Sequence, residues 1–256
     1  MNLILLFDAD FVSPNRVRLT GRRFKHMQDI LKVRQNQSLT VGKINGLMGT
    51  GTLLDKESDA VELEIQLNQK PPQALPLTLI LALPRPPMLK RILFSAAMLG
   101  VKKIIILNFN RVEKSLWNSS ALKPQAITEQ LVLGLEQAKD TIMPEVILKK
   151  GFKPFVDDEL PALIKGKLAL VAHPDKTEVP SPLWRPTIVV GTRPGGLGRG
   201  DQNKGQRPIF LVIGPEGGII DYEIALLKAA GCQPIDLGPR ILRTESVLPY
   251  VVGKLF

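Results

Sequence analysis

Two loops near the C-terminal end combine glycine, proline and charged residues in a way that suggests a ligand site. The first is Gly214-Pro-Glu-Gly-Gly, which follows the apolar run Phe210–Ile213. The second is Gly238-Pro-Arg, which follows the expected short strand Ile235–Leu237. Gly217 and Gly218 of the first loop can take positive φ and leave room for a ligand against the backbone. The two loops therefore predict a site built largely from backbone groups, beside arginines.

The spacing within these loops excludes several familiar chemistries. A dinucleotide loop needs Gly-x-Gly-x-x-Gly and a P-loop needs Gly-Lys followed by Ser or Thr, and neither pattern occurs there. The sequence has no Gly-x-Ser-x-Gly nucleophile elbow. Glu216, Asp221 and Glu223 could form a carboxylate site, but acids also stabilise a helix N-terminus. Spacing alone therefore predicts a ligand site at these loops but does not indicate which reaction or ligand it serves.

Short apolar strands that alternate with helices must position these loops. Phe210–Ile213 has the continuous apolar pattern of a strand covered on both faces. Asp221 is expected to cap the helix after the first loop and Gly231 to end it. A second helix is expected to begin around Arg240, after the second loop. Loops that follow parallel strands meet at the carboxyl edge of the sheet, where α/β proteins usually bind ligands.

The same alternation of strands and helices extends back through the middle of the chain. Leu77–Leu83 and Lys103–Leu107 are apolar strands, and Met88–Leu99 between them has helical spacing. A further helix is expected from Pro124, and Lys167–His173 is a further strand. The βαβ order predicts an α/β fold with a parallel sheet.

The first part of the chain has a different pattern, with a short helix at Arg22–Val33 and strands that alternate polar and apolar residues. The expected strands are Ser38–Gly42, Met48–Leu54 and Ala60–Leu67. These strands favour a small β-barrel. The proline-rich segment Gln69–Pro76 separates it from the α/β part. We therefore expect two domains, a β-barrel at 1–72 and an α/β domain at 73–256.

The chain is basic, with a formal net charge of +10. Seven basic residues and one acid, Asp29, lie between residues 16 and 34. A solvated helix face would usually mix both signs, so this cluster favours contact with RNA or DNA over an inert basic surface. His26 within it is expected to be a surface or packing residue. The expected RNA-binding residues are Arg16, Arg18, Arg22, Arg23, Lys25, Lys32 and Arg34.

The remaining composition narrows the class of protein. The single cysteine, Cys232, cannot form a disulfide within the chain, and zinc-type Cys and His spacing is absent, so no metal is expected. Asp8 and Asp10 interrupt the apolar Met1–Phe11 segment, and no basic n-region or small-residue cleavage site accompanies it. We therefore expect no signal peptide or membrane span, and a cytoplasmic location.

The paired loops resemble motifs of a known family. Ile213-Gly-Pro-Glu-Gly-Gly, a helix, and then Leu237-Gly-Pro-Arg-Ile-Leu-Arg-Thr-Glu-Ser resemble the C-terminal motifs of the RsmE family. Weaker matches in the same order occur at His26–Arg34, Ala96–Val101 and Glu136–Pro144. RsmE proteins are SPOUT-class methyltransferases that act on N3 of a uridine in small-subunit (16S) ribosomal RNA, so the resemblance implies this activity.

The chain also departs from the family pattern. Met98 stands where the family usually has Glu, Asp140 where it usually has Arg, and Ser246 where Thr is common. The glycine- and arginine-rich tract at 193–207 resembles an insertion. These departures leave two alternatives open: a SPOUT methyltransferase with a different RNA target, and a non-catalytic RNA-binding or ribosome-assembly protein.

The resemblance implies a trefoil-knotted C-terminal domain, a homodimer, a PUA-like N-terminal barrel that docks RNA, and S-adenosylmethionine as methyl donor. The strand end at Ala172, His173 and Pro174 would form a third wall beside the two loops. The implied cofactor-binding residues are Ala172, His173, Ile213, Gly214, Pro215, Glu216, Gly217, Gly218, Leu237, Gly238, Arg240, Ile241, Leu242 and Thr244.

The implied chemistry assigns roles to a few charged residues. Negative charge develops on the uracil ring as N3 loses its proton, and Arg243, with Arg240 as a second candidate, could stabilise it. Glu216 or Glu245 is the candidate base, although either could instead pair with an arginine. The target base is expected to leave its stack in order to enter the site.

Overall fold

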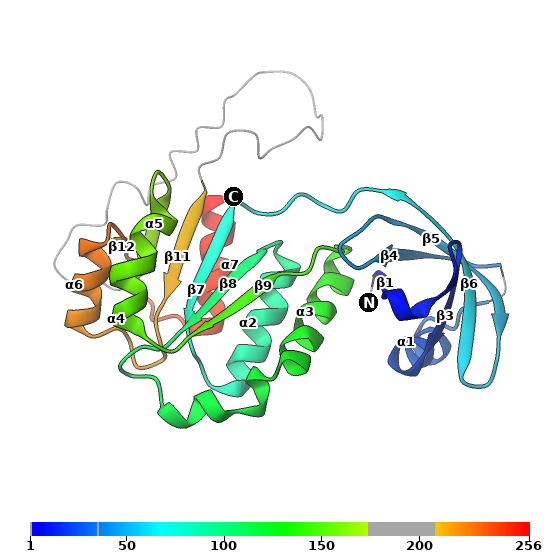
Figure 1. The fold of residues 1–256 in the computed structure, drawn as a ribbon, viewed down its shortest axis with the longest axis horizontal. Helices are drawn as coiled ribbons and strands as arrows, with labels where there is room; N and C mark the ends of the chain where they lie inside the picture. Colours follow the sequence, from blue (N-terminus) through cyan, green and yellow to red (C-terminus); the bar gives the residue numbers. More distant parts are fainter. Residues whose placement is uncertain (1, 35, 174–207) are drawn as a thin grey trace, which may run out of the picture.

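The computed structural model describes residues 2–34, 36–173 and 208–256, so the tract at 193–207 lies outside the described residues. Figure 1 shows an elongated molecule with a β-sheet at each end. One sheet contains the strands of the N-terminal part, and the other contains the strands that alternate with helices. The buried apolar residues form two clusters, one within the N-terminal sheet and a larger one around the other sheet that also includes Leu3 and Leu5.

The N-terminal sheet has six strands in the order β1-β4-β5-β6-β3-β2, antiparallel except for the parallel β1–β4 pair. They are β1 Ile4–Leu6, β2 Phe11–Ser13, β3 Arg16–Thr20, β4 Ser38–Lys43, β5 Met48–Lys56 and β6 Ala60–Gln69. The three expected strands are thus confirmed as β4, β5 and β6. The turn between β4 and β5 contains Asn45, whose φ is 55°, as a tight hairpin requires.

The helical segment after β3 is shorter than expected. It consists of α1, Gly21–Lys25, followed by a π-helical turn at His26–Ile30. The helical spacing predicts one apolar face with Phe24, Met27, Ile30 and Leu31. Phe24 and Met27 are buried, whereas Ile30 is 69% exposed, so its place on that face was wrong. The π-helical turn adds a residue to the turn, which shifts the helical register after Met27.

The second sheet also has six strands, all parallel, in the order β12-β10-β11-β7-β8-β9. They are β7 Leu77–Ala82, β8 Lys103–Leu107, β9 Glu145–Lys149, β10 Leu168–Ala172, β11 Ile209–Ile213 and β12 Gln233–Ile235. The expected parallel α/β sheet is therefore confirmed. The pattern of β9 was weak because this edge strand is only partly buried, with Leu148 42% exposed.

Helices cover both faces of the parallel sheet, which is why its central strands are almost wholly apolar. In Figure 1, α2, α3 and α7 lie on one face and α4, α5 and α6 on the other. Short 3-10 turns occur at Asp8–Asp10, Lys114–Asn118 and Ser120–Leu122, and a π-helical turn at Phe155–Glu159. The helices are α2 Pro86–Met98, α3 Pro124–Ala138, α4 Phe152–Pro154, α5 Leu160–Ile164, α6 Asp221–Ala229 and α7 Thr244–Leu255.

Hydrogen bonds join the N-terminal sheet to the end of α3. The Arg22 guanidinium pairs with the buried carboxylate of Glu136 at 2.8 Å. Burial raises the pKa of Glu136, and the Arg22 charge acts against that shift. The hairpin turn contributes too, because Asn45 N donates to Thr141 O at 2.8 Å and Thr141 Oγ1 donates to Gly46 O at 2.6 Å. These bonds hold the two sheets together independently of the proline-rich segment.

His26 makes stability dependent on pH. Its Nε2 is buried without a hydrogen-bond partner among the described residues. Burial lowers the pKa of His26 below its ordinary value, and the positive N-terminus and Arg22 lower it further. The unfolded chain therefore binds the proton more readily than the folded protein. The contribution of neutral His26 to folding stability is present above its ordinary pKa of about 6.5 and is lost as the pH falls.

We expect the urea concentration at the unfolding midpoint to decrease as the pH is lowered from 7.5 to 5.5. In a His26→Gln variant this dependence of the midpoint on pH should be smaller. Urea unfolding followed by circular dichroism at several pH values measures it. Equal slopes for the two proteins would show that His26 titrates with the same pKa in the folded and unfolded states.

Candidate active site

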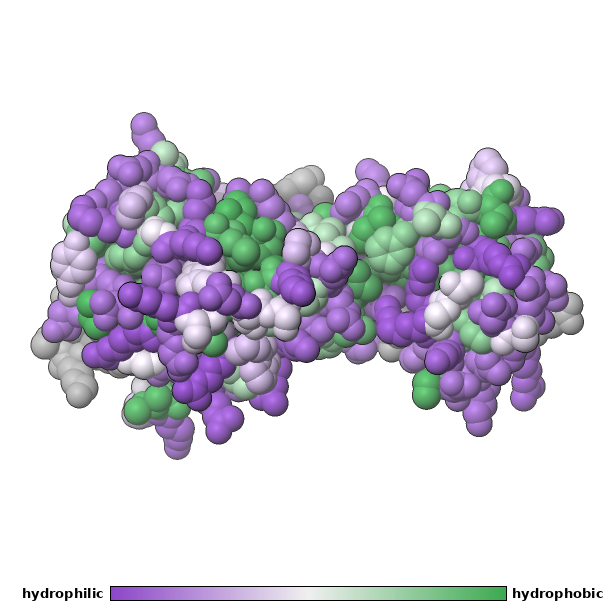
Figure 2. All heavy atoms as spheres, turned by 60° about the horizontal axis from the view of Figure 1, so that its bottom comes forward, coloured by the Kyte–Doolittle hydropathy of each residue, from purple (hydrophilic) through white to green (hydrophobic). Residues whose placement is uncertain are grey.

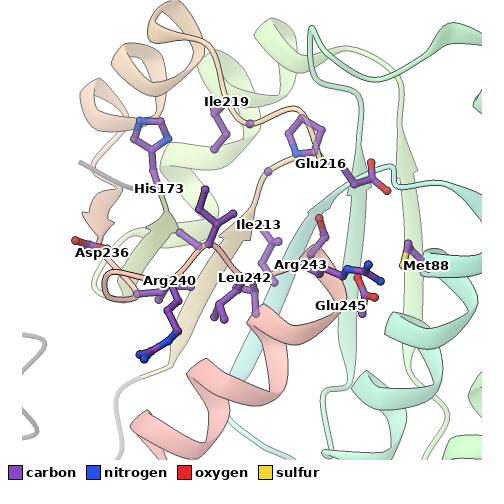
Figure 3. A pocket seen from close by; sticks show the side chains of 18 of the residues that line it. Met88, His173, Ile213, Glu216, Ile219, Asp236, Arg240, Leu242, Arg243 and Glu245 are labelled. Carbon is purple, nitrogen blue, oxygen red and sulfur yellow. The ribbon is translucent and has the colours of Figure 1, made fainter. Parts of the chain in front are cut away.

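A cavity of about 820 Å³ lies beyond the carboxyl ends of β10, β11 and β12. This volume is within the range of small-molecule sites, roughly 300–1,000 Å³. Figure 3 shows His173 and Met88 on opposite sides of the cavity, with Leu242 between them. The walls come from the loops that follow β7, β10, β11 and β12 and from the first turns of α2 and α7. The sequence-based prediction that the two glycine loops lie at one sheet edge agrees with this geometry.

The loop Gly214–Gly218 depends on glycine at two positions for different reasons. A Cβ at Gly214 would lie 2.5 Å from Cγ1 of the buried Ile219, so no larger residue fits there without movement. Gly218 has a φ of 80°, and its N–H donates to Pro215 O at 2.8 Å to close the turn. Of the two paired glycines, only Gly218 uses this freedom, because Gly217 does not have positive φ.

The start of α6 uses a different acid from the one expected. The helix begins at Asp221, so Asp221 is its first residue, and Ile220 occupies the cap position. The buried Glu223 carboxylate accepts hydrogen bonds from Ile220 N at 3.4 Å and from Asn110 N at 2.7 Å. Glu223 therefore stabilises this helix start and ties it to the segment after β8. Glu223 thus has the helix-stabilising role that was the alternative to a carboxylate site.

The second loop continues further than the sequence indicated. Asp236 Oδ1 accepts a hydrogen bond from Gly238 N at 2.9 Å, and Gly238 has a φ of 105°, which turns the chain. Helix α7 then begins at Thr244 rather than near Arg240, with Arg243 in extended conformation at its cap position. Because Arg240–Leu242 stay outside the helix, they form a wall of the cavity.

The candidate bases both have partners. Glu216 Oε1 accepts a hydrogen bond from Arg85 N at 3.2 Å. Glu245, in the first turn of α7, lies 3.5 Å from Nη1 of Arg91 on α2 and has a side chain only 16% exposed. In Figure 3 the Arg243 side chain points toward the side of the cavity that holds Glu216 and Glu245. The Arg240 side chain points away from them, so the two arginines do not converge on one group.

The structure brings the predicted site residues together. Of the fourteen implied cofactor-binding residues, thirteen line the cavity, and Gly217 is the one that does not. Arg243 and Glu245 line it as well, whereas Pro174 lies outside the described residues. Sequence reasoning missed several lining residues. The prolines that follow β7, at positions 84, 86 and 87, were a signal for a further loop at the same sheet edge. The missed residues are Arg85, Pro87, Met88, Ile219, Asp236, Pro239 and Val247.

The basic cluster in the N-terminal part divides into two groups. Three of its arginines form ion pairs within the chain: Arg18 with Glu57 at 2.5 Å, Arg22 with Glu136 at 2.8 Å and Arg23 with Asp10 at 2.5 Å. Their charges are thus offset by structural contacts. The others are exposed, and these four residues are Arg16, Lys25, Lys32 and Arg34.

Other classes of site find little support in the described part of the chain. No group of three or more His, Cys, Asp or Glu side chains there has the arrangement of a metal site. Cys232 is buried, and burial raises the pKa of its thiol to about 11, which makes it unreactive. Hydrophilic side chains predominate on the visible face in Figure 2, with apolar side chains in separate patches. None of the described helices is long and apolar enough to cross a membrane.

A parallel sheet with a glycine-lined cavity at its carboxyl edge is typical of small-molecule cofactor sites in α/β proteins. Residues 71–255 match the family described as the RNA methyltransferase domain. The chain therefore belongs to the RNA methyltransferase domain family.

Relatives across nearly the whole chain confirm the resemblance found in the sequence. "Ribosomal RNA small subunit methyltransferase E" of Treponema pallidum is 27% identical over 249 residues, which cover 95% of this chain and 86% of that protein. "Ribosomal RNA small subunit methyltransferase E 1" of Borreliella burgdorferi is 22% identical over 246 residues, with 96% and 93% coverage.

Solved structures show the same fold. The Neisseria gonorrhoeae ribosomal RNA small subunit methyltransferase E, bound to S-adenosyl methionine, has a TM-score of 0.70 at 22% identity and covers 99% of this chain and 95% of its own. The putative methyltransferase of Legionella pneumophila, in complex with the same cofactor, has a TM-score of 0.69 at 23% identity, with 100% and 97% coverage.

Proposed function

We propose that this chain is an S-adenosylmethionine-dependent methyltransferase that acts on N3 of a uridine in small-subunit ribosomal RNA. The observation that carries this proposal is the cavity at the carboxyl edge of the parallel sheet, because the paired glycine loops and the first turn of α7 converge on it. Relatives named as small-subunit methyltransferases support the RNA target, and their cofactor-bound structures support the methyl donor.

The cavity fits such a cofactor. Its apolar walls, which include Ile213, Leu237 and Leu242, suit a nucleoside base, and the surrounding loops offer backbone N–H and C=O groups for hydrogen bonds. Asp236 and Glu216 at the wall favour polar or positively charged ligand groups. When bound, S-adenosylmethionine supplies an electrophilic methyl group. These residues would hold it, and Arg243 and Glu245 would lie on the substrate side.

The residues of the chain then account for the transfer step. As N3 gives up its proton, the Arg243 guanidinium would stabilise the negative charge that develops on the uracil ring. Glu216 and Glu245 remain the candidate proton acceptors, but their contacts with Arg85 and Arg91 must first loosen. Arg240 points elsewhere in the cavity, which favours a cofactor-binding role for this residue.

We also propose an architecture for the working enzyme. The chain would divide into an RNA-docking, PUA-like domain at 1–72 and a catalytic domain at 73–256. The separate apolar cluster within the N-terminal sheet supports this division, although Leu3 and Leu5 pack into the core around the parallel sheet. The C-terminal segment would form a trefoil knot, and two copies would assemble into a homodimer in the cytoplasm, as the family resemblance implies. No metal takes part in this proposal.

Mapping of methylated nucleotides in small-subunit RNA, with and without the protein, tests the proposed activity. We expect one N3-methyluridine to disappear when the gene is deleted and to return with the wild-type protein. A different modified position would support the alternative RNA target. An unchanged methylation pattern together with absent cofactor binding would support a non-catalytic RNA-binding protein.

The RNA-docking surface gives a separate prediction. The four exposed basic residues Arg16, Lys25, Lys32 and Arg34 are expected to neutralise RNA phosphates. Changing all four to Gln should weaken RNA binding and flatten its salt dependence, since each lost phosphate contact removes roughly 0.7–0.9 from the logarithmic slope. Filter-binding titrations at several salt concentrations measure both quantities.

A matched variant tests whether position matters beyond total charge. It carries the same four-charge loss at exposed lysines outside the N-terminal sheet. Those lysines are Lys90, Lys123, Lys165 and Lys254. Equal weakening by the two variants would argue that RNA binding follows net charge and that the N-terminal cluster is not a docking surface.

A further inference from the structure

The segment after β8 contacts the glycine loop on its outer side. Nη1 of Arg111 donates a hydrogen bond to the carbonyl oxygen of Gly217. The aliphatic part of the same side chain packs against this glycine, because a Cβ at Gly217 would lie 3.3 Å from Arg111 Cδ. Neither Arg111 nor Gly217 lines the cavity. The contact therefore acts on the back of the loop rather than on a bound ligand.

This hydrogen bond fixes one peptide plane. In a trans peptide the carbonyl of Gly217 and the N–H of Gly218 point in opposite directions. Arg111 holds the carbonyl, and Pro215 O accepts from the N–H at 2.8 Å, so both ends of the plane are held. Two adjacent glycines would otherwise let this plane rotate at little cost. Gly218 lines the cavity, so the orientation of the plane determines the surface a ligand meets.

Neighbouring bonds hold the rest of the loop to the same sheet edge. Asn110 N, next to Arg111, donates to Glu223 at 2.7 Å, and Arg85 N donates to Glu216 at 3.2 Å. Because β11, β7 and β8 are adjacent strands, the loops that follow them meet at this edge. Arg111 is the member of this group whose side chain acts directly on the paired glycines.

We propose that Arg111 is a positioning residue for the cofactor. It orients the Gly217–Gly218 peptide and so shapes the wall formed by Gly218, without contacting the cofactor itself. This inference rests on the proposed function, since it names a determinant of S-adenosylmethionine affinity at the same cavity. It predicts that loss of Arg111 weakens cofactor binding while the chemical step and RNA binding remain.

Calorimetric titration with S-adenosylmethionine, followed by steady-state kinetics, tests this role. Arg111→Ala should raise the dissociation constant and the KM for the cofactor about 10-fold, the effect of one lost hydrogen bond to a charged group. Arg111→Lys keeps the stem and one donor and should lie between Arg111→Ala and wild type. Lys114→Ala removes the same charge from an exposed residue of the same segment and should leave both constants unchanged.

The kinetic constants separate positioning from other roles. The kcat at saturating cofactor and the KM for RNA should match wild type. An unchanged cofactor affinity in Arg111→Ala, or a raised KM for RNA alone, would overturn the inference. A lower melting temperature with fewer binding sites but wild-type affinity would also overturn it, because that pattern describes a purely structural residue. Absence of binding by the wild-type protein would refute the proposed function itself.

Discussion

An Arg243→Ala variant is expected to lose methylation almost completely while it still binds S-adenosylmethionine. Arg243 lines the cavity, and its side chain points toward the side that holds Glu216 and Glu245. If the guanidinium stabilises charge that exists only in the transition state, its removal lowers kcat by roughly 100- to 1,000-fold and leaves ground-state binding largely intact. Single-turnover methylation at saturating cofactor measures kcat, and calorimetry measures binding.

The structure makes this substitution a fair test. The Arg243 side chain makes no capping hydrogen bond at the start of α7, so alanine should leave the helix in place. Lys254→Ala, an exposed charge at the other end of α7, is the matched control and should retain full turnover. Wild-type turnover in Arg243→Ala would remove this residue from the mechanism. A parallel loss of cofactor affinity would reassign Arg243 to cofactor binding.

Local pattern was sufficient to predict the scaffold of the site. The strands β7, β8, β10 and β11 are short apolar runs, and their continuous pattern distinguishes a buried parallel sheet from an amphipathic one. The glycines and prolines after β11 and β12 then place two loops at one edge. The family resemblance then implied fourteen cofactor-binding residues in and beside these loops, and thirteen of them line one cavity.

The errors occurred where tertiary contacts outweigh local preference. Arg240–Leu242 could continue a helix, but they form a wall of the cavity, and α7 starts later. Asp221 is a good cap residue by type, yet Ile220 occupies the cap position. The Glu223 carboxylate accepts hydrogen bonds there from Ile220 N and from Asn110 N of a distant segment. Local spacing contains no information about such partners.

The basic cluster and Arg111 illustrate the same limit. Three of the seven basic residues in the cluster are paired with acids, and the partner of Arg22 is 114 positions away in sequence. Arg111 lies in a segment with no recognisable motif, and its contact with the glycine loop joins residues 106 positions apart. Charge counts identify a basic region, but the ion pairs within the chain determine which of its side chains remain available to contact RNA.

A Gly214→Ala variant is expected to lose both stability and cofactor binding, because the added Cβ would overlap Cγ1 of Ile219 at 2.5 Å. Either the loop backbone or the buried Ile219 must move, and overpacking of this kind costs roughly 1–3 kcal/mol of folding stability. Both line the cavity, so the same displacement should weaken cofactor binding by about 10-fold or more. Urea unfolding and calorimetric titration measure the two effects.

Two comparisons determine whether the overlap is the cause. Gly253→Ala on α7 places a Cβ where no atom lies within 4 Å, so it should be neutral or slightly stabilising. In an Ile219→Ala background the overlapping Cγ1 is absent, so the added cost of Gly214→Ala should largely disappear there. If Gly214→Ala costs the same in both backgrounds, the loop requires glycine for its backbone freedom, and the close approach of Ile219 has no part in shaping the cofactor wall.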